Sequence, residues 1–181
     1  MFRVFIETAE DAVKQRTSSL SLLKRDLKST DSKMRKEAIL ALPESLGDYP
    51  ITDAADLILV INERLEGSEQ ECRESLRGEL VNKLARIARI SLNRDALLGL
   101  YRRIVDTRES LYVRERAANG IGTFLQFANI DDKLGFLNLE ESQIETLGIA
   151  MKDIPPCSIE SVLGILFFKN SVSSLKPSPA A

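Results

Sequence analysis

The sequence contains no histidine, no tryptophan and only two cysteines. Without histidine, the serine–histidine and cysteine–histidine nucleophile systems, histidine general bases and histidine metal ligands are all excluded. The two cysteines, Cys72 and Cys157, cannot by themselves form a zinc site or a disulfide framework. We therefore expect a protein that is not an enzyme, with no catalytic residues, no metal and no cofactor.

The chain also lacks a strong net charge and a long apolar run. Its 25 basic and 27 acidic side chains give a formal net charge of −2, which carries no global signal for nucleic acid or membrane. No apolar run approaches the roughly 18 residues of a membrane span, and the start of the chain does not resemble a secretory signal. These features predict an intracellular protein without a membrane partner.

What the sequence does contain is an internal repeat. Three segments, residues 34–46, 72–84 and 113–125, each carry four apolar side chains spaced four residues apart, so that each has one apolar face as a helix. A second apolar helical pattern precedes each segment. The matching columns of the three segments are Met34/Cys72/Val113, Ala38/Leu76/Ala117, Leu42/Leu80/Ile121 and Leu46/Leu84/Leu125.

This pattern predicts helix hairpins with a period near 40 residues, which is typical of HEAT and armadillo repeats. A single hairpin cannot bury its own apolar face, and stacking hairpins on one another gives a continuous core. We therefore expect an all-α fold, an α-solenoid of about four HEAT-like antiparallel hairpins in one domain over residues 1–170. The expected parts are an incomplete first repeat 1–16, repeats 17–46, 51–89, 93–128 and 139–169, and a flexible tail 171–181.

One arginine occupies the same place in each of the three segments, directly after the first apolar position. An acidic residue precedes each of these arginines by four or five positions. Such pairs could link neighbouring repeats as a ladder of structural contacts, and they could alternatively form a row of donors for an acidic peptide. The residues of this repeat ladder are Asp31, Arg35, Glu69, Arg73, Glu109 and Arg114.

The middle of the chain is basic and its end is acidic. Residues 71–103 contain eight basic and four acidic side chains, and residues 129–160 contain seven acidic side chains and two lysines. A basic middle could bind an acidic protein partner or a phosphate backbone. No aromatic residues alternate with the arginines on the helix expected over 71–90, which weakens the nucleic-acid alternative. The candidate partner-binding residues are Arg73, Arg77, Arg86, Arg89, Arg102 and Arg103.

Small residues interrupt the third repeat at Gly120-Ile121-Gly122. The third glycine of a dinucleotide-binding loop is missing, and the glycines lie in the middle of an expected helix. They therefore predict a place where two helices approach closely.

The residues Arg35-x-x-Ala38-Ile39-x-x-Leu42-Pro43, then Ala55-Asp56, then Val113-Arg114-Glu115-Arg116-Ala117 resemble the N-terminal helical-repeat region of the apoptosis inhibitor 5 (antiapoptosis clone 11) family. The resemblance spans about residues 15–175. It implies an all-helical, non-catalytic scaffold that is located in the nucleus and suppresses apoptosis by binding other proteins. Members of that family continue into a second domain and a basic tail, so we expect either a fragment or a short relative.

Together these observations favour a scaffold or adaptor that holds a peptide or a helix of another protein in a groove of the repeat array. The alternative is a helical-repeat protein that binds nucleic acid through residues 71–103. The resemblance suggests the nucleus as its location, and without the resemblance the cytoplasm is the simpler expectation.

Overall fold

A computed structural model describes residues 2–66, 71, 73–127, 139–152 and 154. Every regular element in these ranges is an α-helix, which confirms the predicted all-α class. The chain divides into two compact units, residues 1–83 and 84–181, where the sequence predicts one domain. The solenoid arrangement of the repeats stays a prediction. None of the helices in these ranges is both long enough and apolar enough to cross a bilayer.

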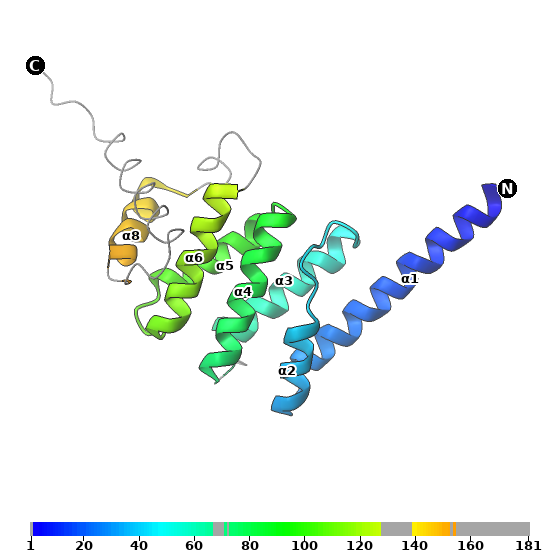
Figure 1. Ribbon diagram of the computed structural model, residues 1–181, viewed down its shortest axis with the longest axis horizontal. Coiled ribbons are helices and arrows are strands. Elements are labelled where there is room, and N and C mark those ends of the chain that lie inside the picture. The colour runs from blue at the N-terminus through cyan, green and yellow to red at the C-terminus, as the bar shows by residue number, and fades with distance from the viewer. Residues whose placement is uncertain (1, 67–70, 72, 128–138, 153, 155–181) are drawn as a thin grey trace, which may run out of the picture. The chain divides into compact units, whose positions relative to one another are not determined.

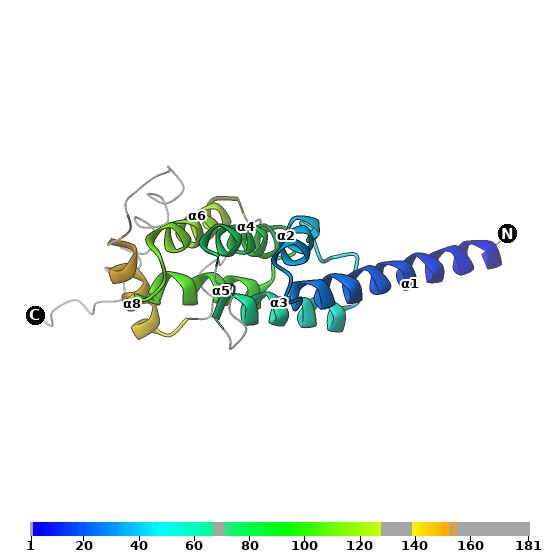
Figure 2. The ribbon, with the colours of Figure 1, turned by 90° about the horizontal axis from the view of Figure 1, so that it is seen from below.

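The first unit contains three whole helices and part of a fourth. These are α1 (Phe2–Leu27), α2 (Ser32–Ala41), α3 (Ile51–Glu66) and the first part of α4 (Glu74–Ile90). Helix α1 packs against both α2 and α3, and Figures 1 and 2 show α2 and α3 on different sides of its C-terminal half.

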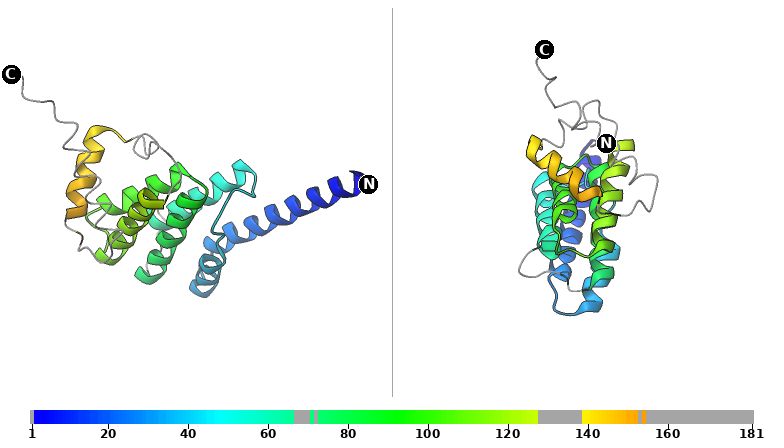
Figure 3. Two further views of the ribbon diagram at one scale, coloured as in Figure 1. Left: turned by 45° about the horizontal axis from the view of Figure 1, so that its top comes forward. Right: turned by 90° about the vertical axis from the view of Figure 1, so that its left-hand side faces the viewer.

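Helix α1 is continuous over 26 residues. The sequence predicts a repeat boundary near residue 16, between an incomplete first repeat and the next one. The expectation that one helix ends there and another begins is wrong. Residues 2–27 contain neither proline nor glycine, and the serines and threonine at 17–19 are tolerated inside a helix. As a result, the N-terminal half of α1 runs past the ends of α2 and α3 (Figure 3).

Helix α2 is shorter than the repeat pattern predicts. Asp31 caps its start, since the Asp31 side chain accepts a hydrogen bond from the backbone N–H of Lys33 at 2.8 Å. It ends at Ala41 because Leu42 precedes Pro43 and is extended, with φ −56° and ψ 134°. Leu42 and Leu46 nevertheless stay buried in the core.

The second unit contains the rest of α4, α5 (Arg94–Val105), α6 (Leu111–Phe127) and α8 (Glu141–Lys152). Helix α5 packs against both α6 and α8. Asn93 caps its start, and the Asn93 side chain accepts a hydrogen bond from the backbone N–H of Ala96 at 3.0 Å. Helix α8 matches the first helix of the predicted repeat 139–169. The second helix of that repeat and the tail 171–181 lie outside the described residues.

The repeat columns supply the core of both units. Among the described residues, the second, third and fourth columns are all buried. The first column is mixed, since Val113 is fully buried and Met34 is 38% exposed, and Cys72 lies outside the described residues. The buried column members are Ala38, Leu42, Leu46, Leu76, Leu80, Leu84, Ala117, Ile121 and Leu125.

Gly120 allows the close helix contact that the sequence predicts. A Cβ atom at this position would lie 2.7 Å from the Ala85 Cβ and 3.1 Å from the Leu100 Cδ1. The first distance is shorter than any ordinary carbon–carbon contact. A side chain at position 120 would therefore push α4 and α5 away from α6.

We predict that Gly120→Ala lowers the free energy of unfolding by about 1–3 kcal/mol, because it overpacks this contact. Urea titration followed by circular dichroism measures the change. Gly148→Ala in α8 is the matched control, since nothing lies within 4 Å of its added Cβ. Alanine is the better helix former there, so the control should be neutral or raise stability by up to about 1 kcal/mol. Equal effects of the two substitutions would contradict the packing role of Gly120.

Candidate functional site

A buried glutamate organises the turn between α3 and α4. Glu71 is only 1% exposed, and its Oε2 lies 3.7 Å from the Nη2 of Arg64 on α3. Its backbone N–H donates to the Arg64 carbonyl at 2.7 Å, and its Oε1 accepts from the backbone N–H of Arg73 at 3.1 Å. The glutamate thus ties the end of one helix to the start of the next.

Arg35 of α2 adds a second arginine to this carboxylate. Its Nε donates to the Glu71 Oε2 at 2.5 Å and its Nη2 to the Oε1 at 3.3 Å, which is the paired geometry that guanidinium and carboxylate favour. Its Nη1 donates to the carbonyls of Ser29 and Thr30 in the turn between α1 and α2. One side chain therefore fastens the turn of the first hairpin to the turn of the next.

These contacts also set the charge of Glu71. Burial raises the pKa of a carboxyl group, but hydrogen bonds from Arg35 and the Arg73 backbone and the charges of Arg35 and Arg64 outweigh it. The pKa of Glu71 is therefore below its ordinary value of 4.5. The carboxylate remains ionised, and it is stabilised only as long as its arginines are in place.

The second unit contains the same kind of turn between α5 and α6. The buried Arg103 pairs with the buried Glu109 at 3.3 Å, and the Glu109 Oε1 accepts from the backbone N–H of Ser110 at 2.9 Å. Arg114 of α6 then donates through Nε to the Ile104 carbonyl at 3.0 Å and through Nη2 to the Ala150 carbonyl of α8 at 3.2 Å. Arg35 and Arg114 thus both bridge to a group 36 residues further along the chain.

The ladder partners differ from those that the sequence predicts. Arg35 pairs with Glu71, while Asp31 caps α2. Arg114 binds two carbonyls, and Glu109 pairs with Arg103. The reason is geometric, because Asp31 and Glu109 each lie just before the helix that carries the arginine and are used there by backbone N–H groups or by the preceding helix. Arg73 is exposed, and Glu69 lies outside the described residues.

Sequence reasoning missed Arg64 and Glu71, although a signal was present. Arg64 and Arg103 each directly precede a buried apolar residue near the end of the first helix in their hairpin, Leu65 and Ile104. A glutamate follows each arginine seven or six residues later. Aligning the first helices as strictly as the second ones would have revealed this repeated Arg–Glu pair.

We predict that Glu71→Gln lowers the free energy of unfolding by roughly 3 kcal/mol, because it leaves two largely buried arginines without their carboxylate. Thermal and urea unfolding both measure this loss. The matched control is Glu63→Gln, which breaks the exposed Lys28–Glu63 pair of 3.2 Å and should cost less than about 1 kcal/mol. If both variants unfolded alike, the buried turn would not be a main support of the unit.

We also predict that the turn loses stability in acid. Because the pKa of Glu71 is lower in the folded state than in the unfolded one, its contribution is complete above the unfolded value near 4.5 and declines as the pH falls through the folded value. Urea midpoints measured between neutral pH and pH 3 should fall less steeply for Glu71→Gln than for the natural chain. If the urea midpoints of the two proteins fell equally as the pH is lowered, this role of Glu71 would be contradicted.

The six candidate arginines do not form one basic site. Arg103 is buried against Glu109, and the half-buried Arg77 donates through Nη2 to the Leu65 carbonyl at 3.4 Å. Arg86 and Arg102 are exposed in the second unit, together with the half-buried Arg89, whereas the exposed Arg73 belongs to the first. Three of the six arginines are therefore at least partly enclosed, and the set is divided between the two units.

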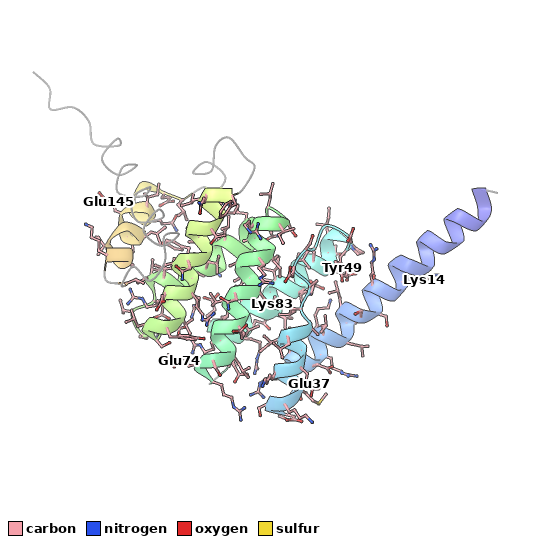
Figure 4. All side chains as sticks on the ribbon, viewed as in Figure 1. Lys14, Glu37, Tyr49, Glu74, Lys83 and Glu145 are labelled. Carbon is pink, nitrogen blue, oxygen red and sulfur yellow. The ribbon has the colours of Figure 1, made fainter. Side chains whose placement is uncertain are left out.

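Another basic residue of the segment 71–103 also makes hydrogen bonds within the protein. The Nζ of Lys83, labelled in Figure 4, donates to the carbonyls of Leu40 and Leu42 at 3.1 and 3.0 Å. These carbonyls lie at the C-terminal end of α2, where a cation is favoured by the helix dipole. Lys83 therefore fixes α4 to the end of α2, and this contact accounts for part of the basic composition.

A groove of about 400 Å³ lies between α1 and α3 in the first unit. Helix α1 supplies a basic wall and α3 a wall with two acids. The buried Val60 and the 60% exposed Leu59 add apolar surface. The lining residues are Lys24, Arg25, Lys28, Asp56, Leu59, Val60 and Glu63.

Oppositely charged side chains of α1 and α3 face one another across this groove. Lys24 lies 3.5 Å from Asp56, and Lys28 lies 3.2 Å from Glu63, so bases of α1 face acids of α3. Asp56 is 62% exposed and Glu63 is 56% exposed, and such exposed pairs rearrange at little energetic cost. The groove lining therefore combines apolar side chains of α3 with ion pairs between α1 and α3.

Among the described residues, no group of three or more cysteine, aspartate or glutamate side chains is arranged to hold a metal ion. The fold and its contacts define an all-α protein built from helix hairpins with arginine-linked turns. No protein-family model, no curated protein and no solved structure matches the chain. The resemblance to the apoptosis inhibitor 5 family thus stays a prediction.

Proposed function

We propose that this protein is a non-catalytic scaffold or adaptor that binds a helix of a protein partner in the groove between α1 and α3. The observation that carries this proposal is the groove itself, whose lining combines the exposed Leu59 with basic side chains of α1 and acidic side chains of α3. An amphipathic helix placed in a groove between two helices is an established mode of peptide recognition.

The chemistry of the groove suggests what the bound helix carries. An apolar side chain would contact Leu59 and Val60, acidic side chains would face Lys24 and Lys28, and basic side chains would face Asp56 or Glu63. Most of the affinity would come from the apolar contact, and the charged side chains would mainly set orientation and specificity. The weak internal ion pairs across the groove would exchange for similar pairs with the partner.

A nucleic-acid function is supported less well. It depends on the basic residues 71–103, and several of these make structural contacts, among them Arg77, Lys83 and Arg103. A site for phosphate backbone needs cations that stay available to the ligand.

The family resemblance suggests the setting of the proposed scaffold. It favours a role in cell-survival regulation and a nuclear location, and both are part of the proposal. Fractionation of cells that produce the natural chain, followed by blotting of nuclear and cytoplasmic fractions, tests the location independently of the groove.

We predict that Leu59→Glu abolishes partner binding, because it replaces the exposed apolar side chain of the groove lining with a charge. The natural chain and the variant are immobilised, and proteins retained from extract of the source cells are quantified by mass spectrometry. Partners held through the groove should fall at least tenfold on Leu59→Glu.

The matched control is Ile51→Glu, which adds the same charge at an 88% exposed position of α3 outside the groove lining. It should retain the same proteins as the natural chain. Equal retention by both variants would refute the groove as the binding site. Retention no greater than that of an unrelated helical protein would refute the scaffold function altogether.

A further inference from the structure

A tyrosine and an arginine form a stacked pair on the first two turns of α6. The guanidinium carbon of Arg116 lies 4.5 Å from the centre of the Tyr112 ring, which is within the range of a cation–π interaction. The two residues are four positions apart and therefore share one face of the helix. The stacking holds the guanidinium flat and orients its N–H groups.

This guanidinium is not neutralised within the described part of the chain. Arg116 is half-buried, and its buried Nε makes no hydrogen bond there. Two neighbouring arginines do have partners. Arg108, in the turn before α6, pairs with Asp106 at 3.0 Å, and Arg114, on α6, donates to two carbonyls. A cation that is partly desolvated and lacks a carboxylate gains most from an anionic partner.

Apolar surface adjoins the stacked pair. Leu111 is 47% exposed and the Tyr112 ring is 36% exposed, while Glu115 beside them is half-buried. Tyrosine and arginine are the residue types that, together with tryptophan, most often dominate binding energy at protein interfaces. The patch thus combines an oriented positive charge with two apolar contacts on one helix.

We propose that this patch, composed of Leu111, Tyr112 and Arg116, is a docking site for an acidic, apolar segment of a partner protein. A carboxylate of the segment pairs with the Nη groups of Arg116, and an adjacent leucine-type side chain contacts Leu111 and the Tyr112 ring. The charge complementarity selects this occupant, because the guanidinium needs an anion and the surface beside it is apolar. The patch lies in the second unit and is independent of the groove between α1 and α3.

The test uses the full chain and four labelled probes, with binding measured by fluorescence anisotropy. Three are 15-residue peptides with the same leucines, in which the remaining positions are mainly glutamate, glutamine or lysine. The fourth is a single-stranded DNA oligonucleotide. The glutamate peptide should bind most tightly, and Arg116→Gln should weaken it about tenfold, corresponding to the loss of about 1.4 kcal/mol from one charge-assisted pair.

Arg108→Gln is the matched control, since it removes an 89% exposed arginine that already has a carboxylate partner. It should change the affinity for the glutamate peptide less than twofold. Arg116→Lys should recover only part of the loss, because lysine keeps the charge but lacks the planar fork. Circular dichroism melting curves verify that each variant is folded.

Three outcomes would overturn the proposal. The glutamate peptide could fail to bind, it could bind Arg116→Gln as tightly as the natural chain, or the oligonucleotide alone could depend on Arg116. None of these results bears on the groove, because Leu59→Glu leaves the α6 patch unchanged and is tested with different ligands.

Discussion

The structure depends on buried carboxylates at the turns between paired helices. Glu71 and Glu109 each bind an arginine from the end of the helix before the turn and a backbone N–H near the start of the helix after it. A buried carboxylate is costly unless it is paired and hydrogen-bonded, so these groups tolerate little rearrangement. They hold two helices, each apolar on one side only, together as a hairpin of defined geometry. Both the groove and the α6 patch depend on this geometry.

Much of the fold could be predicted because it follows from local rules. Periodic apolar residues identify the helices, Asp31 and Asn93 identify two of their starts, and Gly120 identifies a close helix contact. The ladder partners could not be predicted, because several acids compete for each arginine and the choice depends on three-dimensional distance. The continuity of α1 follows from the absence of proline and glycine over residues 2–27, which a search for repeats does not weigh.

Candidate binding surfaces were harder still to identify from composition. A basic segment indicates where positive charge is concentrated, but it does not show which side chains remain available. Arg103, Arg77 and Lys83 contact groups of their own unit, whereas Arg116, which composition does not distinguish, lies over a tyrosine ring and has no carboxylate partner among the described residues. Whether a charged side chain can bind a ligand depends on the contacts that it already makes in the folded protein, and the structure shows these contacts.

The bridges made by Arg35 and Arg114 also bear on how the chain folds. Each joins groups 36 residues apart, which is about the length of one hairpin. The loop-closure entropy of such a link is modest, and it rises only slowly with loop length. Because each bridge joins one hairpin to a group in the next part of the chain, we expect the formation of one hairpin to favour the ordering of its neighbour.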